Sequence, residues 1–340
     1  MMDNKLLQDK IIELIQLSSS ASEHEDLIRE IVITALRLSQ SHVTRGDLKI
    51  IHAALKEMRY AFKLFAPYKE MKKVSVFGSA RTRSSEPIYE HSAEFARKIS
   101  AEGFMVITGA GEGIMRAAQG GAGRDKSFGM NILLPFEQSA NEFIENDPKL
   151  MTFKYFFTRK LFFIKEANAI ALFPGGFGTH DEAFEALTLL QTGKSNPLPV
   201  VFIDSPGGTY WKAWRIYVED ELLSRGLISP DDMNFFKLTD HIDAAVKEIT
   251  HFYYNYHSLR FVRDKLVIRL NHKIQKKMLD DLNDSFPDII VSGKITETEA
   301  LSDEMNEPKW VALPRIVFNF NRRGFGRLRQ MIDAVNGYGP

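Results

Sequence analysis

Apolar residues follow a helical spacing through the first 70 residues of the chain. Leu27 and Ile31 are typical of this pattern, and a third stretch from Leu48 to Phe65 repeats it. The serine run Ser18–Ser20 predicts a turn between the first two helices. We therefore expect residues 1–70 to form a helical extension that serves packing or oligomerisation, since the segment contains no chemical motif.

Short apolar runs then alternate with amphipathic stretches from residue 71 to residue 254. This alternation is typical of a parallel sheet with helices on both faces, a Rossmann-like α/β core. Several of the apolar runs end in glycine-rich turns, where such sheets place their ligands. The expected strands are Val74–Phe77, Met105–Thr108, Gly129–Leu134, Ala169–Phe173 and Pro199–Asp204, and the clearest helices are Ile88–Ala101 and Asp181–Gln191.

Residues 255–340 change pattern again. Strands and helices alternate there in an order that predicts a small α+β module of ferredoxin-like or ACT-like type. By analogy with ACT-like modules, we expect this module to be regulatory. The expected elements are strand Lys265–Leu270, helix Ile274–Phe286, strand Asp288–Lys294, an acidic linker from Glu297 to Glu307, strand Arg315–Asn319 and helix Phe325–Asn336.

Composition narrows the function classes. The 340 residues carry a formal net charge of zero, so no overall basic field favours nucleic acid or an anionic membrane. The chain has no cysteine, which excludes disulfides, thiolate metal sites and a cysteine nucleophile. No run approaches the ~20 apolar residues of a membrane span, and the first 17 residues do not resemble a signal peptide. We expect a cytoplasmic protein.

The strongest chemical signal is the segment 174–182, which reads PGGFGTHDE between an apolar strand and a helix. Gly175, Gly176 and Gly178 let the backbone approach a ligand, and the free N–H groups at the start of the next helix favour a phosphate. Thr179 adds a hydroxyl donor, and Glu182 adds a carboxylate. The alternative is that the acidic residues only complement the helix dipole.

Two further glycine turns follow strands of the same predicted sheet. One contains Gly109, Gly111 and Gly113, and the other contains Gly78 and Ser79. The first differs from the dinucleotide-binding fingerprint because its third glycine comes one position early. Because the carboxyl ends of parallel strands share one edge of a sheet, the three turns predict one crevice that could hold a mononucleotide.

Two charged residues between the third and fourth predicted strands complete the candidate site. Arg159 offers a planar fork that suits phosphate or carboxylate, although a lone arginine is more often on a solvated helix face. Glu137 follows a strand end, where it could accept a hydrogen bond from a sugar hydroxyl. No histidine has metal-ligand spacing, and no cofactor is expected.

These motifs resemble the Lonely Guy (LOG) family of nucleotide phosphoribohydrolases, whose members are often mislabelled lysine decarboxylases. The similarity rests on PGGFGTHDE, the upstream TRK and the turn TGAGEGIM, over roughly residues 74–250. The resemblance implies a Rossmann-like fold, assembly as a homodimer or higher homo-oligomer, and metal-free hydrolysis of nucleoside 5′-monophosphates. It implies Arg159 and Glu182 as catalytic residues, a phosphate loop at 175–179, and Glu137 as a nucleotide contact.

The alternative function is a non-catalytic nucleotide sensor or carrier on the same fold, since fold does not determine function. A pyridoxal-dependent decarboxylase is disfavoured because no motif indicates a Schiff-base lysine. In the C-terminal module, Arg322, Arg323 and Arg327 lie beside two glycines at an expected strand-to-helix turn. They could bind an anionic effector such as a regulatory nucleotide; the alternative is a solvated helix start.

Overall fold

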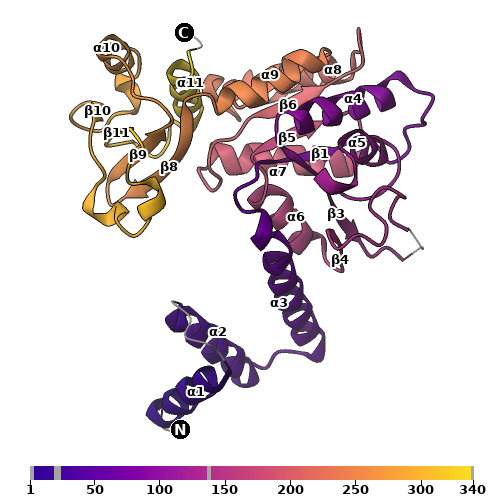
Figure 1. Cartoon of the computed structure of the whole chain (residues 1–340), viewed down its shortest axis with the longest axis vertical. Coiled ribbons are helices and arrows are strands. Elements are labelled where there is room, and N and C mark those ends of the chain that lie inside the picture. The colour runs from indigo at the N-terminus through magenta and orange to yellow at the C-terminus, as the bar shows by residue number, and fades with distance from the viewer. Residues whose placement is uncertain (1–3, 19–23, 136–138, 338–340) are drawn as a thin grey trace. The chain divides into compact units, whose positions relative to one another are not determined.

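We analysed a computed structural model of the chain, which describes residues 4–18, 24–135 and 139–337. The chain divides into two compact units, residues 1–59 and residues 60–340. Within the described ranges, no helix is long and apolar enough to cross a membrane. Figure 1 shows the helices of the first unit in indigo and the two sheets of the second unit in magenta to yellow.

The first unit consists of helices, as the apolar spacing predicts. Its elements are α1 (Asn4–Ser18), α2 (Glu25–Arg37) and most of α3 (Arg45–Phe65). Ile11, Ile15 and Ile33 form its small buried cluster. The start of α3 is fixed by Thr44, whose hydroxyl accepts a hydrogen bond from the Asp47 N–H. The second half of the predicted serine turn, at 19–20, lies outside the described residues.

The second unit begins with a seven-stranded, wholly parallel sheet in the order β4-β3-β2-β1-β5-β6-β7. All five predicted strands are present in it. Two strands escaped prediction because they are short and lie at the sheet edges, where the apolar signal is weak. The strands are β1 (Lys73–Phe77), β2 (Met105–Thr108), β3 (Ser127–Ile132), β4 (Leu150–Phe153), β5 (Ala169–Leu172), β6 (Val200–Ile203) and β7 (Phe236–Thr239).

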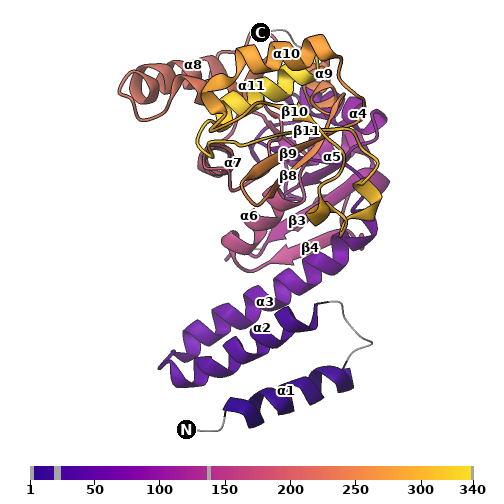
Figure 2. The same cartoon turned by 90° about the vertical axis from the view of Figure 1, so that its left-hand side faces the viewer.

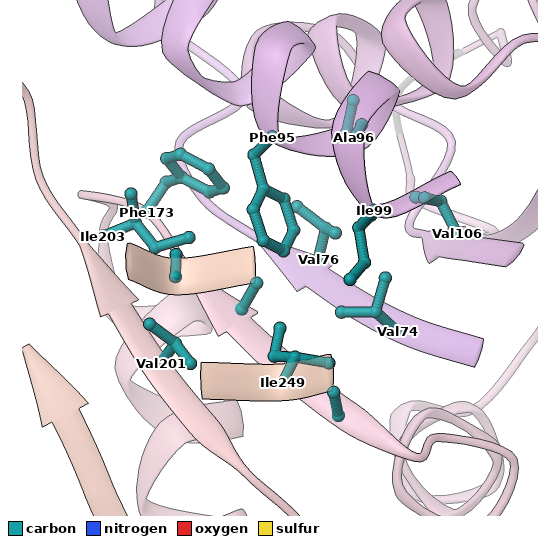
Figure 3. Close-up of a cluster of buried hydrophobic side chains, with 14 of the residues drawn as sticks. Val74, Val76, Phe95, Ala96, Ile99, Val106, Phe173, Val201, Ile203 and Ile249 are labelled. Atoms are coloured by element: carbon teal, nitrogen blue, oxygen red, sulfur yellow. The ribbon is translucent and has the colours of Figure 1, made fainter. Parts of the chain in front are cut away.

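One face of this sheet carries the main apolar core. Val74 and Val76 of β1 point toward α4 (Pro87–Ala101), whose Phe95 packs among them, as Figure 3 shows. α5 (Ile114–Ala122) and α9 (Ile242–Phe252) cover the same face. The alternation of side chains along β1 leaves its other residues, such as Phe77, for the opposite face.

The opposite face is covered by α6 (Phe156–Lys165), α7 (Phe177–Gln191) and α8 (Tyr210–Tyr217). The Ser75 hydroxyl donates to the Phe163 carbonyl of α6, and the Phe77 and Phe163 rings lie 4.8 Å apart. Helices therefore cover both faces, as the sequence predicts. Both α6 and α7 begin close to the carboxyl ends of the strands, where the predicted site residues occur.

The strand order reverses between β1 and β5, which are neighbours in the sheet although β2, β3 and β4 separate them in sequence. The connections after the two strands diverge at this point and leave a crevice above their carboxyl ends, the usual ligand position in open α/β sheets. Gly78 follows β1, and Gly175 follows β5. The fold thus brings two of the predicted turns to the switch point.

The C-terminal part is an antiparallel four-stranded sheet in the order β10-β11-β9-β8, with two helices that lie side by side (Figure 2). This confirms a small α+β module. Residues 288–294 are not the expected strand: a single turn at Pro287–Ile289 and one bridge from Ile290 to Phe320 replace it. The elements are β8 (Tyr256–Val262), β9 (Lys265–Leu270), α10 (Lys276–Ser285), β10 (Thr296–Glu297), β11 (Arg315–Phe318) and α11 (Phe325–Val335).

The module is firmly joined to the parallel core. Arg329 of α11 lies 2.6 Å from Glu248 of α9, and both side chains are buried. The Asn336 side-chain amide donates to the Phe252 carbonyl at the end of α9, and its oxygen accepts the backbone N–H groups of Asn255 and Tyr256 at the start of β8. A Cβ on Gly326 would lie 2.1 Å from the Asp231 carbonyl, so α11 approaches the core at backbone distance.

Candidate functional site

A cavity of about 970 Å³ lies at the carboxyl ends of β1 and β5. It brings together most of the residues that the sequence analysis proposed, from all three glycine turns and from α6 and α7. This volume falls at the upper end of the usual range for small-molecule sites, about 300–1,000 Å³. The proposed residues that line it are Gly78, Ser79, Gly109, Arg159, Gly175, Gly176, Gly178, Thr179 and Glu182.

The loop after β5 has the geometry of an anion cradle. Helix α7 begins at Phe177, with Gly176 as its N-cap, so its free N–H groups lie at the cavity wall. A Cβ on Gly176 or Gly178 would meet nothing within 4 Å, which leaves room for a ligand. On Gly175 it would lie 2.1 Å from the Thr179 hydroxyl oxygen, so that glycine is required for packing.

The start of α7 is four residues earlier than the sequence predicted. Glu182 therefore lies in the second turn of the helix, beyond the reach of the dipole effect at the first turn. The difference arises because glycine disfavours a helix interior, whereas here Gly176 serves as the N-cap and Gly178 lies within the first turn of α7. A dipole-complementing role alone does not explain a carboxylate at this position.

The other two turns support this loop. Ser79 donates its N–H to the Pro174 carbonyl and accepts the Ile114 N–H with its own carbonyl. Gly113 has a φ of +64° and a Cβ there would lie 2.2 Å from the Ser79 carbonyl oxygen, so only glycine fits. Gly111 accepts a hydrogen bond from Asn141. In the described structure these two glycines hold the turns together and are not part of the cavity lining.

Arg159 projects from α6 into the cavity. Its guanidinium carbon lies 5.0 Å from the centre of the Phe156 ring and 5.5 Å from that of Phe163. Its Nε is buried and has no hydrogen-bond partner among the described residues. Burial lowers the pKa of Arg159, while the nearby Glu182 raises it. Arginine stays protonated in proteins, so burial does not neutralise this side chain. It therefore presents a desolvated positive charge.

Glu182 is the most perturbed acid of the cavity. Only 5% of the residue is exposed, and its Oε2 has no hydrogen-bond partner within the part of the chain described. Burial raises the pKa of Glu182 to about 7, against the opposing effect of the positive charges of Lys160 and Arg159. A carboxyl with a pKa near neutrality is suited to exchange between its two protonation states during a reaction.

Lys160 lies next to Arg159 in sequence but has a different environment. Its ammonium nitrogen lies 2.6 Å from a carboxylate oxygen of Asp181 and 3.6 Å from one of Glu185. These contacts connect α6 to α7 and hold Lys160 close enough to influence the charge on Glu182. The sequence pattern does not distinguish Arg159 from Lys160. In the structure, α6 directs Arg159 into the cavity, whereas Lys160 is paired with carboxylates.

Several cavity residues carried no sequence signal of their own. Asn131 lies at the end of β3 and is 8% exposed, and its amide oxygen accepts the Ile132 N–H. Met115 and Phe156 also line the cavity. Only their positions, at a strand end or at a helix start, could have indicated them. Glu137, the predicted nucleotide contact, lies outside the described residues.

The arginines proposed for an effector have partners of their own within the module. Arg327 donates to both carboxylate oxygens of Asp288, at 2.9 and 3.0 Å. Arg322 donates to the Arg263 carbonyl and stacks on the Phe261 ring at 4.7 Å. Arg323 is exposed. An effector site here stays a prediction, as does the homodimer. No cluster of three or more metal-binding side chains occurs in the described ranges.

The sheet order and the cavity at its switch point define a Rossmann-like α/β protein. Residues 112–249 match the family model described as "Possible lysine decarboxylase". These residues form a domain of that family, the LOG family whose motifs the sequence carries. The family match covers residues 112–249 and not the segments on either side. The homology to the curated relative is distant.

Three individual proteins are similar to part of this chain. A cytokinin riboside 5′-monophosphate phosphoribohydrolase of Mycobacterium tuberculosis is 27% identical over 177 residues, which are 51% of this chain and 91% of that protein. The molybdenum cofactor carrier protein of Chlamydomonas reinhardtii is similar in structure, with 17% identity over 53% of this chain and 96% of that one, and a TM-score of 0.37. The molybdenum cofactor binding protein of Rippkaea orientalis matches the same shares, with 16% identity and a TM-score of 0.37.

Proposed function

We propose that this chain hydrolyses the N-glycosidic bond of nucleoside 5′-monophosphates to free base and ribose 5-phosphate. The observation that carries the proposal is that Arg159 and Glu182 line one cavity, each with a buried polar atom that has no partner among the described residues. Native proteins seldom leave such atoms unpaired, so a ligand is the expected partner. The distant relative from M. tuberculosis is named for a reaction of this class.

The 5′-phosphate would bind at the start of α7. The open space at Gly176 and Gly178 admits its oxygens, and Thr179 contributes a hydroxyl. The positive end of the helix dipole favours a dianion at this position. Anchoring the phosphate would place the ribose further into the cavity, so that binding energy from a non-reacting group positions the reacting bond.

In the reaction, the bond between C1′ and the base nitrogen breaks and its electron pair stays on the base, which takes up a proton. A water oxygen forms the new bond to C1′ and releases one proton. The ionised carboxylate of Glu182 would stabilise the positive charge that develops on the ribose, accept the proton from water, or both. Arg159 would bind the nucleotide and neutralise negative charge on it.

The test is a product assay on the purified full chain with a panel of nucleoside 5′-monophosphates, scored for free base and ribose 5-phosphate. We expect release that requires the 5′-phosphate and shows the preferred base. The Glu182→Gln variant should lose roughly 10²–10⁴-fold in kcat. Glu185→Gln is the matched control, because it makes the same change one turn along α7, at a half-buried position outside the cavity lining.

Two results would contradict this proposal. Near wild-type turnover in Glu182→Gln would exclude the role given to that carboxylate. No turnover of any monophosphate, together with measurable binding, would favour the alternative of a nucleotide sensor or carrier on the same fold.

A further inference from the structure

A second groove, of about 750 Å³, lies on the outer side of α6 and α7, between these helices and the first strand of the C-terminal module. Its walls include Lys160 of α6, Glu185 of α7, Lys194 and Asn196 of the connection to β6, and His257 of β8. It shares no lining residue with the cavity at the switch point. The groove therefore borders both helices that carry the proposed catalytic residues, but on a separate surface.

The charges that line this groove are mainly positive. Lys160, Lys165 and Lys194 contribute three ammonium groups, against the single lining carboxylate of Glu185. Lys165 is paired with Glu166 at 2.6 Å. Lys194 is exposed, and among the described residues it has no ion pair. Lys160 is paired too, with Asp181 at 2.6 Å, so Lys194 is the lining lysine without a carboxylate partner among the described residues. Its charge, together with the shared charges of Lys160 and Lys165, favours an anionic ligand.

The described residues on the module side of the groove contribute no carboxylate to its lining. The pKa of His257 is lowered, first by burial and then by the nearby charges of Arg269, Lys72 and Lys309. Lys72 lies over the Tyr253 ring at 4.9 Å, and the Tyr253 hydroxyl donates to the Asn168 carbonyl. The lowered pKa favours the neutral imidazole of His257, which can form hydrogen bonds with a ligand in the groove.

The rest of the groove surface suits the ring of a nucleotide-sized molecule. Phe157 and Leu161 line it with exposed apolar side chains, and Asn168 and Asn196 provide amide groups. Its volume lies within the usual range for small-molecule sites, about 300–1,000 Å³. A ligand with phosphates at one end and a flat ring at the other matches both parts of this surface.

We propose that this groove is a second binding site, for a phosphate-bearing small molecule of nucleotide size whose phosphates contact Lys160, Lys165 and Lys194. The site would differ from the predicted effector site at Arg322, Arg323 and Arg327, which lies elsewhere in the module. It does not depend on the proposed hydrolysis, because binding can be measured without turnover.

The experiment is a calorimetric titration of the full chain with ADP, in a variant that blocks the first cavity. Gly176→Glu suits this purpose: its φ of −86° is open to any residue and its Cβ position is free of contacts, while the new carboxylate repels phosphate from the loop. In this background ADP should still bind. Adding Lys165→Glu and Lys194→Glu should weaken that binding by about tenfold or more.

The matched control is Lys212→Glu with Lys247→Glu, two exposed lysines outside the groove, which changes the net charge equally. It should leave ADP binding in the Gly176→Glu background unchanged. Loss of all ADP binding in Gly176→Glu alone would overturn the groove site, and so would equal effects of the two lysine pairs. A parallel titration with inorganic phosphate tests whether the nucleoside part of the ligand contributes to binding. If phosphate binds as tightly as ADP, the groove is a site for phosphate alone. If phosphate binds more weakly than ADP, the groove is a site for a nucleotide.

Discussion

Buried charges occur in two regions of this protein, and their surroundings differ. In the C-terminal module, Glu304 is 1% exposed and accepts two hydrogen bonds from Arg269, at 3.0 and 2.8 Å. Arg315 lies 2.7 Å from the same carboxylate, without hydrogen-bond geometry for that pair, and donates to three backbone carbonyls. In the cavity of the core, Arg159 and Glu182 each keep a buried polar atom without a described partner.

The difference separates a stabilising cluster from a candidate reactive one. A buried ion pair with its hydrogen bonds made is held in place by its partners, and removing one partner is costly. Buried polar atoms without partners destabilise the folded protein by about 1–3 kcal/mol each unless a ligand supplies the missing contacts. The module therefore uses buried charge to fix the segment around 301–307. In the core, the atoms without described partners are those that the proposed function assigns to ligand contact.

The largest expected effect on stability is that of Glu304→Gln. This change leaves the guanidinium group of Arg315 buried without a countercharge, while Arg269 keeps Glu307 as a partner. We therefore expect the free energy of unfolding to fall by about 3–5 kcal/mol. Denaturant unfolding of the full chain measures it. Glu182→Gln makes the same chemical change in the cavity and should leave the stability at pH 7 unchanged or increase it. Equal losses in the two variants would remove the distinction between the clusters.

The second expected effect is an opposite dependence of stability on pH. Burial raises the pKa of Glu182 to about 7, so between about pH 4.5 and 7 the folded protein holds a proton that the unfolded chain has lost. The contribution of Glu182 to stability therefore decreases as the pH rises through this window, by up to about 3 kcal/mol. Burial alone would raise the pKa of Glu304 too, but hydrogen bonds from Arg269 and the Leu301 N–H, together with the positive charge of Arg315, lower it.

For Glu304 the pH dependence has the opposite sign. The contribution of Glu304 to stability is present above the pKa of this carboxyl in the unfolded chain and is lost as the pH falls below that value. The measurement is the difference in unfolding free energy between the wild type and each glutamine variant, from about pH 3, below the unfolded pKa of a glutamate, to about pH 8. The wild type should lose stability relative to Glu182→Gln as the pH rises to about 7. A flat difference would mean that Glu182 is not desolvated in the folded protein.

The sequence predicted the core and its glycine turns well, because both depend on local patterns. Apolar runs identified β2 to the residue, and the motif at 174–182 identified the loop before α7. The edge strands β4 and β7 were missed because short, partly exposed strands lack a continuous apolar run. The strand expected at 288–294 was wrong because Pro287 begins a turn there.

The environment of each charge could not be read from the sequence. Arg159 and Lys160 are neighbours, yet the turn of α6 sends one into the cavity and the other toward Asp181. Glu304 lies in a segment that reads as a solvated acidic linker, but the fold buries it against two strands. Partners distant in sequence decide these outcomes, and local patterns do not contain them.

The smallest expected effect concerns how Arg159 is held. The Phe156 ring lies 5.0 Å from the Arg159 guanidinium and is 56% exposed, so it contributes a cation–π contact at a partly solvated site. Such contacts are worth about 0.5–1 kcal/mol. Phe156→Leu keeps the apolar bulk and removes the ring face, so kcat/KM for the preferred monophosphate should fall by about 2–5-fold. Phe157→Leu is the matched control, because Phe157 is equally exposed but lines the groove and not the cavity. An equal fall in both variants would mean that the ring face does not position Arg159, and that the unpaired arginine is held by α6 and Phe163 alone.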